Sequence, residues 1–445
     1  MNDRAAGEHT CDLAVIGAGA AGLFAAIWAG RTLAGRTVRG GARRPNVVAL
    51  DGARVLGAKI LVAGGGRCNV THHAVDESAY AGSSRHAIKK VLRSFGVERT
   101  IGFFRERGVE LKREDTGKLF PVSDDARTIL DALLGAARDA GVKITFPWRV
   151  SGVRREGDGF VIARAAASDP AIGAPAPPGD ALRARRVILA TGGRSLPRTG
   201  SDGLGYDVAR TLGHTITPRV FPALVPLTLA EGCPVRALAG VTVPATIELR
   251  SGTGRRLAAF TNSTLCTHFG ISGPGVLDIS RYYTDARGED PGAHLVINWL
   301  PGARADAMDA ALRRLGRGSV GRFLHERGLP TRLAESLCRE AGVDPGAAGH
   351  GLTREGRRAL LGVLTEMPLP VTGDRGFQYA EVTAGGVPLS EIHLDSMESR
   401  VCPRLHVCGE ICDVDGRIGG FNFQWAWSSG YLAGVGAASR IELHA

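Results

Sequence analysis

A glycine-rich segment near the start of the chain has the spacing that binds a phosphate-containing dinucleotide. In DLAVIGAGAAGLFAAIWAGR, Gly17, Gly19 and Gly22 form the pattern G-x-G-x-x-G. The first glycine permits a tight turn, the second lets backbone approach a pyrophosphate, and the third lets a helix pack close to a strand. The amides and dipole at the start of that helix then face the phosphates. The apolar residues around the pattern predict the required strand over 13–16 and helix over 23–29.

A carboxylate follows the next buried run. In a dinucleotide-binding unit the second strand commonly ends in an acid that holds the adenosine ribose. Residues 46–50 read NVVAL and Asp51 comes next, so we predict Asp51 as the ribose ligand. A basic, glycine-rich insert over 32–45 lengthens the usual spacing. The alternative is an ordinary acid at a strand end.

Four further blocks combine glycines with polar residues. Two of them, GGGRCN (64–69) and ATGG (190–193), follow apolar runs that we read as strands, the first over 60–62. Successive glycine amides suit an anion or a flat ring pressed against the backbone. The third block is THFGISGP (267–274). The fourth block, 409–430, places a Gly–Glu pair before an apolar helix. This pair would give the cofactor a second contact far along the chain from the first fingerprint, which favours a long cofactor such as FAD over NAD. We expect no separate NAD(P)H domain.

Two residues in these blocks are candidates for catalysis. Cys68 is a candidate thiol beside a cofactor ring, and the alternative is a small buried residue that shapes its loop. His268, flanked by glycines, is a candidate proton donor to a substrate or stabiliser of charge on the cofactor. The alternative for His268 is a loop histidine without a chemical role. No spacing of ligands indicates a metal site.

These motifs need elements that bring the two ends of the chain together. The pattern predicts an α/β fold, in which a Rossmann-like FAD-binding domain carries an inserted domain. We expect the first part of the FAD-binding domain over 1–215 and its C-terminal part over 377–445. Between them, 216–376 is the predicted substrate domain, β-rich over 216–300 and helical over 301–366.

Composition limits the function classes. The chain has 445 residues, enough for two or three domains, and a formal net charge of +11. Only six of its 55 basic residues are lysine, and the arginines are spread without a basic cluster interleaved with aromatics, so a nucleic-acid partner is not expected. Eight scattered cysteines, no basic leader and no long uninterrupted apolar run indicate a soluble, cytoplasmic, reduced protein without a membrane partner.

Together these motifs resemble a known family. The fingerprint, GGGRCN, KLFPVSD (118–124), ATGG, THFGISGP, TAGG (383–386), MES (397–399) and GGFNFQWAWSSG (419–430) are similar to the bacterial aminoacetone-oxidase-family FAD-binding flavoproteins. That family also includes proteins described as bile-acid dehydro-reductases. The resemblance covers about residues 11–438. The sequence departs from it in the insert before Asp51, in Asp51 where Glu is commoner, and in a Pro-rich segment over 168–180.

The resemblance implies non-covalent FAD and assigns residues to its parts. Gly17, Gly19, Gly22 and Asp51 would hold the ADP half. The ribityl chain and ring would contact Gly64, Gly65, Gly66, Arg67, Cys68, Asn69, Gly409 and Glu410. Asn422, Phe423 and Gln424 would sit at the helix facing the flavin pyrimidine. The remaining predicted cofactor contacts are Ala20, Ala21, Lys59, Val150, Thr191, Gly192, Gly193, Asp415 and Gly420.

The function predicted on this basis is FAD-dependent oxidoreduction of a small, hydrophobic or carbonyl-conjugated molecule. NAD(P)H is the expected transient electron donor. Reduction of an enone-like double bond and oxidation of an amine both remain open. The alternatives are a flavoprotein that binds or modifies RNA, suggested by the charge, and a flavin-binding protein with little catalysis. The substrate, the electron donor and the oligomeric state are left open.

Overall fold

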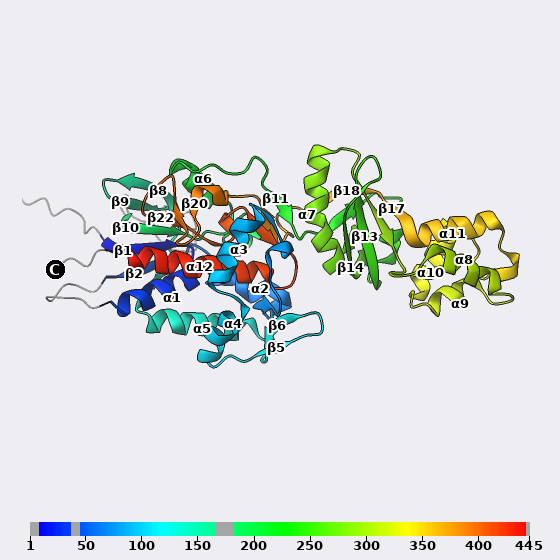
Figure 1. Cartoon of the computed structure of the whole chain (residues 1–445), viewed down its shortest axis with the longest axis horizontal. Coiled ribbons are helices and arrows are strands. Elements are labelled where there is room, and N and C mark those ends of the chain that lie inside the picture. Colours follow the sequence, from blue (N-terminus) through cyan, green and yellow to red (C-terminus); the bar gives the residue numbers. More distant parts are fainter. Residues whose placement is uncertain (1–8, 37–44, 166–180, 442–445) are drawn as a thin grey trace, which may run out of the picture. The chain divides into compact units, whose positions relative to one another are not determined.

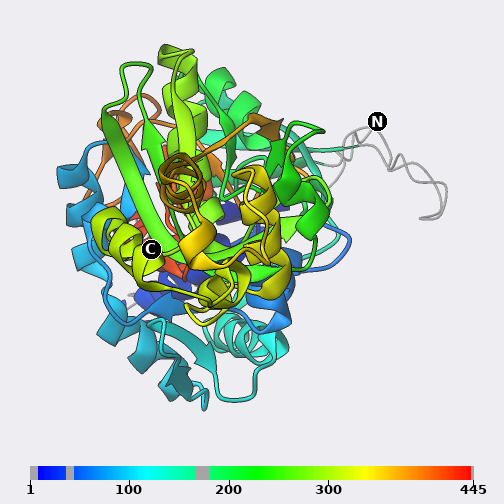
Figure 2. The same cartoon turned by 90° about the vertical axis from the view of Figure 1, so that its right-hand side faces the viewer.

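The chain forms two compact units. The computed structural model describes residues 9–36, 45–165 and 181–441, drawn in two views in Figures 1 and 2. One unit combines the chain up to Phe221 with the chain from Val382, and the other is Pro222–Glu381. Each unit has its own buried apolar core. The chain crosses from the first unit to the second after Phe221 and back after Glu381. The insertion was expected over 216–376, so both crossings lie a few residues later in the sequence than predicted. All of the Pro-rich segment (168–180) and most of the insert before Asp51 (32–45) lie outside the described residues.

The first unit is built on a sheet with parallel central strands. Its strand order is β20-β21-β22-β10-β1-β2-β7, and the hairpin β8–β9 pairs with β10. The strands β22, β10, β1, β2 and β7 are parallel, as expected for a Rossmann-like sheet covered on both faces. The bounds are β1 His9–Ile16, β2 Val47–Leu50, β7 Val142–Thr145, β8 Val150–Glu156, β9 Gly159–Arg164, β10 Ala181–Leu189, β20 Ile392–His393, β21 Glu398–Ser399 and β22 Leu405–Val407.

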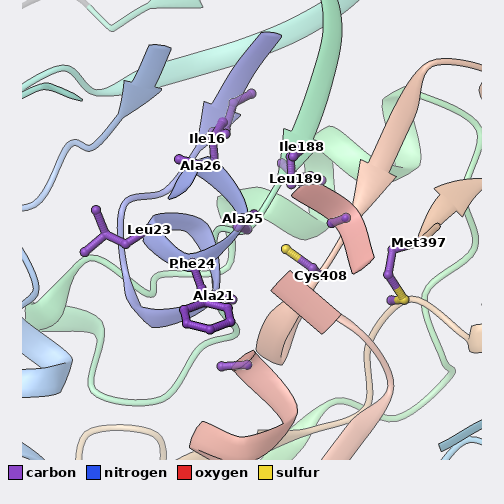
Figure 3. Packing of buried hydrophobic residues seen from close by; sticks show 14 of the residues in the cluster. Ile16, Ala21, Leu23, Phe24, Ala25, Ala26, Ile188, Leu189, Met397 and Cys408 are labelled. Carbon is purple, nitrogen blue, oxygen red and sulfur yellow. The ribbon is translucent and has the colours of Figure 1, made fainter. Parts of the chain in front are cut away.

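Two long helices of this unit, one from each end of the chain, pack closely. They are α1 (Ala20–Ala34) and α12 (Phe421–Ser439). A Cβ on Gly430 would lie 2.7 Å from the carbonyl oxygen of Ala21, and one on Gly434 would lie 2.2 Å from that of Ala25. Only glycine permits this approach, which brings the C-terminal motif against the fingerprint helix. Figure 3 shows part of the buried apolar set beside α1.

Shorter elements complete the first unit. Residues 60–62, expected as a strand, belong to the helix α2, because a short apolar run has no decisive period. Small sheets pair β3 with β6 and β6 with β5, and β23 with β4. The bounds are α2 Ala58–Gly66, α3 Arg85–Ser94, α4 Val97–Glu106, α5 Ala126–Asp139, α6 Leu204–Thr211, β3 Thr71–His72, β4 Tyr80–Gly82, β5 Leu111–Arg113, β6 Lys118–Pro121 and β23 Val414–Gly416.

The second unit has an antiparallel sheet of order β17-β16-β13-β14-β15-β12-β18. The expected order of a β-rich part followed by helices is observed, but the helix α7 interrupts the β-rich part and was not predicted. The bounds are β12 Leu227–Leu229, β13 Thr242–Arg250, β14 Arg256–Thr267, β15 Gly270–Ser272, α7 Pro274–Glu289, β16 His294–Asn298, α8 Ala305–Arg314, α9 Val320–His325, α10 Thr331–Glu340, α11 Arg354–Glu366, β17 Met367–Leu369 and β18 Val371–Asp374. The strands β11 (Phe221–Ala223) and β19 (Val382–Ala384) lie at the two crossings.

Two negative observations limit the functional interpretation. Gly316, Gly318 and Gly321 repeat the spacing G-x-G-x-x-G. The helix α8, not a strand, precedes them, and Gly321 already lies in α9, so they form no second dinucleotide unit. Within the part of the chain that the structure describes, no helix is both long and apolar enough to cross a membrane.

Candidate cofactor site

Four of the predicted motifs meet at one edge of the parallel sheet. Gly17 follows β1, Asp51 follows β2, Ala190 follows β10 and Cys408 follows β22. Because these strands are parallel, their carboxyl ends share an edge, which is where open α/β sheets bind ligands. The sheet therefore brings motifs from both ends of the chain to one place.

The three fingerprint glycines meet different steric demands. Gly17 has φ +95°, and a Cβ there would lie 2.4 Å from the carbonyl oxygen of Ala190. A Cβ on Gly22 would lie 1.8 Å from the carbonyl oxygen of Gly17. Gly19, the N-cap of α1, has φ −78°, and no atom lies within 4 Å of a Cβ built on it. The protein itself therefore needs Gly17 and Gly22, whereas the absence of a side chain at Gly19 leaves room for a ligand.

The start of α1 has hydrogen-bond donors without a partner among the described residues. No side chain caps this end, and its first turn contains no acid. The amides of Ala20, Ala21 and Gly22 precede the first backbone bond of the helix, from Leu23 to the carbonyl of Gly19. Free amides and the positive end of the helix dipole suit a phosphate group.

Asp51 is fixed by the backbone around it and keeps room for further bonds. Its Oδ2 accepts from the amide of Ala18 at 2.7 Å, and its Oδ1 accepts from the amide of Ala53 at 2.8 Å. Each carboxylate oxygen has two acceptor positions, so one on each remains for ribose hydroxyls. The amide of Trp148 donates to the Asp51 carbonyl at 2.6 Å, which brings the segment leading into Val150 alongside.

The triple-glycine loop has a backbone that other residues rarely adopt. Gly64, Gly65 and Gly66 have φ of 59°, 70° and 87°, and Cys68 has φ of 58°. Gly64 and Gly65 are exposed, and no atom lies within 4 Å of a Cβ built on Gly65. Asn69 is 8% exposed, and within the described residues its Oδ1 has no hydrogen-bond partner. An open glycine backbone beside an unused acceptor fits a flat ring that carries an N–H group.

Arg67 holds this loop in place through its side chain. Its Nη1 lies 2.7 Å from Glu114 Oε1 and 3.6 Å from Asp124 Oδ1, and its guanidinium lies 4.0 Å from the centroid of the Phe120 ring. The hydrogen bond to Glu114 raises the pKa of Arg67. Glu114 precedes the motif KLFPVSD, which contains the other two residues, so this motif anchors the loop. A direct contact of Arg67 with a cofactor stays a prediction.

Cys68 does not have the environment of a reactive thiol. Its side chain is fully buried in the apolar core, and this burial raises the pKa of the thiol. A thiolate is the reactive form of cysteine, and burial away from charge disfavours it. The geometry therefore argues against the catalytic interpretation and favours a residue that shapes its loop.

A network of polar side chains joins four separate segments. Lys59 Nζ lies 2.5 Å from Glu410 Oε2 and 2.6 Å from Ser195 Oγ. Ser195 Oγ donates to Glu410 Oε1 at 2.7 Å, and the amide of Thr383 donates to the same oxygen at 3.1 Å. Thr383 Oγ1 in turn accepts from the amide of Ser195 at 3.0 Å. Ser195 and Thr383 are fully buried, so the network is fixed within the first unit.

Within the described residues, the network leaves one acceptor and one donor unused side by side. Both acceptor positions of Glu410 Oε1 are occupied, whereas Oε2 has one left. Lys59 has three N–H donors and uses two of them. An adjacent donor and acceptor fit an alcohol group, such as those of a ribityl chain.

The predicted glycines at the strand ends allow close packing. Gly409 has φ +80°, and a Cβ there would lie 2.7 Å from Ala21 Cβ, so Glu410 follows a residue in contact with the start of α1. A Cβ on Gly193 would lie 2.4 Å from Thr383 Oγ1. Gly192 has φ +72°, and Thr191 precedes it at the end of β10.

The polar side chains at the start of α12 are engaged within the protein. Gln424 Oε1 accepts from Thr71 and Thr100 at 2.7 and 3.0 Å, and its Nε2 donates to the carbonyl of Phe95 and to Ser428. All four hydrogen-bonding positions of this amide are therefore used. The side chain of Gln424 is buried and held by these partners, so a contact of Gln424 with a cofactor stays a prediction that only its backbone could meet.

The neighbours of Gln424 are held in a similar way. Asn422 Oδ1 accepts from the amide of Gly416 at 2.8 Å, and its Nδ2 donates to the Gly416 carbonyl at 2.9 Å. The ring of Phe423 stacks on that of Trp427 with centroids 5.6 Å apart. Asp415 is buried, and Gly420 is the N-cap of α12 with φ +93°. The part of this block that remains for a ligand is the uncapped backbone at the start of α12.

Comparison with known proteins places the chain in a family. It matches the family described as HI0933-like protein Rossmann domain over residues 11–436. The chain belongs to this HI0933-like family. The predicted family resemblance and the Rossmann-like fold class are thereby confirmed.

Two relatives of known name cover almost the whole chain. One, from Clostridium scindens, is named 3-dehydro-bile acid delta(4,6)-reductase, and it is 35% identical over 96% of this chain and 99% of its own. Another, from Escherichia coli, is named ribosomal RNA dihydrouridine synthase, and it is 33% identical over 94% of this chain and 96% of its own. A solved quinol–fumarate reductase with menaquinol has a similar fold, with a TM-score of 0.50, 16% identity and coverage of 98% of this chain and 72% of its own.

His268 is not among the residues that this site brings together. It lies in the second unit, exposed in the turn between β14 and β15. Conversely, Ser195 and Thr383 take part in the network around Glu410 but were not predicted. The signal that could have found them is the two motifs themselves, because Ser195 lies two residues after ATGG and Thr383 is the first residue of TAGG.

Proposed function

We propose that this HI0933-like chain is an FAD-dependent oxidoreductase that reduces a carbon–carbon double bond conjugated to a carbonyl group. The observation that supports this most is the continuity of the candidate site. The open backbone at Gly19 contacts the Gly409–Glu410 segment through Ala21, and Glu410 reaches Lys59 on α2, which runs into the triple-glycine loop. A site that extends from a phosphate-binding turn to a ring-sized cradle suits a long cofactor such as FAD.

The proposal gives each part of the site one task. The free amides at the start of α1 bind the pyrophosphate, and Asp51 accepts from ribose hydroxyls. Lys59 and Glu410 hold an alcohol of the ribityl chain, and the loop from Gly64 supports the ring. Bound FAD would supply hydride transfer, which is chemistry of the cofactor and not of any side chain.

The names of the relatives support this reaction class. A 3-dehydro-bile acid with a double bond at position 4 contains a carbonyl conjugated to that bond, and the C. scindens relative is named as a reductase of such a compound. Dihydrouridine is uridine with one ring double bond saturated, and that bond is also conjugated to a carbonyl. In either substrate one carbon receives a hydride and its neighbour a proton. NAD(P)H is the proposed source of the electrons, and His268 is the proposed proton donor.

The cofactor is tested by releasing it from the purified protein. Acid precipitation should leave free FAD in the supernatant at about one per chain, as non-covalent binding requires. FMN, NAD or no chromophore in well-folded protein would refute the proposal. Anaerobic mixing with NADH and NADPH in turn then measures flavin reduction, and rapid bleaching by one of them would exclude a flavin-binding protein with little catalysis.

A substrate within RNA is a second candidate, favoured by the E. coli relative's name and by the net charge of +11. A nucleic-acid partner was not expected from the sequence, because the arginines are spread along the chain. Contacts with phosphates release counterions, so RNA binding by the intact protein should weaken steeply as salt is raised. Absence of RNA binding at low salt would leave the small-molecule substrate.

A further inference from the structure

The motif THFGISGP is the predicted block that the cofactor site does not use. It lies in the second unit, where several of its residues have a structural role. Thr267 Oγ1 accepts from the amide of Gly270 at 3.1 Å, which closes the turn after β14. A Cβ on Gly273 would lie 2.8 Å from the carbonyl oxygen of Ser263. The turn itself does not require the side chains of His268 and Phe269.

These two side chains belong to a stack of rings around an arginine. The guanidinium carbon of Arg375 lies 4.3 Å from the centroid of the Phe269 ring and 4.0 Å from that of the Tyr379 ring. The ring of His268 lies edge-on to Phe269, with centroids 5.2 Å apart. We call His268, Phe269, Arg375 and Tyr379 the stacking patch.

Backbone contacts with β12 and with Pro226, the residue before it, hold the two loops that form the stacking patch. The carbonyl of Phe269 accepts from the amide of Leu229 at 3.0 Å, and the amide of Arg375 donates to the carbonyl of Pro226 at 3.1 Å. The strand β12 pairs with β15 on one side and with β18 on the other. The patch is therefore preorganised by the sheet of the second unit, which reduces the entropy cost of binding.

The stacking patch contains polar groups that the protein does not use. Among the described residues, the Arg375 guanidinium forms no hydrogen bond or ion pair, and it lies half-buried against two aromatic rings. Tyr379 is 53% exposed, and within the same residues neither its hydroxyl nor the exposed His268 ring has a hydrogen-bond partner. Arg327 provides a contrast, because it lies 3.4 Å from the Phe323 ring but also donates to the Phe323 carbonyl.

We infer that the stacking patch binds a planar ring that carries a carbonyl conjugated to a double bond. Aromatic faces and a stacked guanidinium favour a flat π system, and the free N–H and O–H groups can donate to its carbonyl oxygens. Uracil in single-stranded RNA and the 4-en-3-one ring of a steroid share this chemistry. The inference rests on the proposed function, since it names the residues that recognise the substrate.

The test measures binding directly and needs no turnover. Purified full-length protein is titrated in one arm with fluorescein-labelled oligouridine, followed by anisotropy, and in the other arm with a 3-oxo-4-ene steroid, followed by calorimetry. The variants are Arg375→Lys, which keeps the charge but loses the planar fork, and Tyr379→Ala, which removes one face. Tyr379→Phe keeps that face. Arg327→Lys is the matched control, an arginine over an aromatic ring outside the stacking patch.

Wild type should bind at least one probe, and Arg375→Lys and Tyr379→Ala should each weaken that binding about ten-fold or more. Tyr379→Phe should bind more tightly than Tyr379→Ala, and Arg327→Lys should stay close to wild type. No binding of either probe by wild type, or equal binding by the patch variants and wild type, would overturn the inference. Flavin content is measured in the same samples, so a failure of the proposed cofactor is seen separately.

Discussion

Replacement of Gly19 by valine should separate cofactor binding from folding. A Cβ on Gly19 meets no atom within 4 Å, and the extended backbone at this N-cap suits valine. The cost to the apoprotein should be about 1 kcal/mol or less, the usual loss when a β-branched residue replaces a favourable N-cap. The branched side chain would instead occupy the space in which we place the pyrophosphate.

The expected loss of affinity follows from the amides that the side chain would screen. A hydrogen bond from a backbone amide to a charged group contributes about 1.5–3 kcal/mol, so losing two at the start of α1 removes about 3–6 kcal/mol. FAD binding should then weaken by a factor of roughly 10² to 10⁴. The assay is a titration of apoprotein with FAD, followed by quenching of flavin fluorescence, alongside thermal unfolding of the same apoprotein.

Two further glycine variants control this experiment. Gly102→Val makes the same change at another position with no atom within 4 Å, on α4, and should bind FAD like wild type. Gly22→Ala places a Cβ 1.8 Å from the carbonyl oxygen of Gly17 and should destabilise the fold by about 3 kcal/mol or more. A stable Gly19→Val protein with wild-type FAD affinity would show that the pyrophosphate does not lie over this turn.

Other predictions concern single side chains. Cys68→Ala should change the rate of flavin reduction by less than about three-fold, because burial keeps the thiol protonated. A rate that falls by the ~10²–10⁴ typical of a catalytic acid or base would restore the catalytic interpretation of Cys68. His268→Ala should keep its flavin but slow the substrate half-reaction by about 10²–10⁴, and a change within about three-fold would leave His268 without a chemical role. Lys59→Met should lower the free energy of unfolding by about 1–3 kcal/mol, because the Glu410 carboxylate loses a hydrogen-bond donor. Glu410→Gln in the same chain should recover part of this loss, and strictly additive effects of the two substitutions would contradict the network. Burial lowers the pKa of His406 to about 4, below the value of about 6.5 in the unfolded chain, so its contribution to stability is complete above about pH 6.5 and falls as the pH is lowered towards 4. Chemical unfolding should show a loss of about 2 kcal/mol between pH 7 and pH 5 that shrinks in His406→Gln, and an unchanged loss in that variant would assign it to other groups.

Some of the cofactor site is determined by short segments of sequence. The fingerprint could be predicted because its strand, turn and helix are consecutive. Gly22 packs against Gly17, five residues earlier, and Gly17 packs against Ala190 at the end of the neighbouring strand. Asp51 could be predicted for the same reason, as the residue after a buried strand, and its role as ribose ligand stays a prediction. The strand expected over 60–62 was wrong, because three apolar residues have no period that separates a strand from a helix.

Other features depend on contacts between distant segments, which sequence patterns do not specify. The direction of the Gln424 side chain is set by Thr71, Thr100 and Phe95, so its sequence position at the start of α12 did not reveal its role. Burial in the core, not the neighbouring sequence, decides that the Cys68 thiol stays protonated.

The amino-acid sequence by itself was enough to predict the Rossmann-like fold class, the glycine-rich turn after β1 and the family. The tertiary structure alone decided which polar groups share hydrogen bonds. Glu410 meets Lys59 across 351 positions of sequence, and Lys59 meets Ser195 across 136. The physical reason is that the parallel sheet collects the ends of strands from both termini at one edge, whereas a hydrogen bond depends on distances of about 3 Å that only the folded chain fixes.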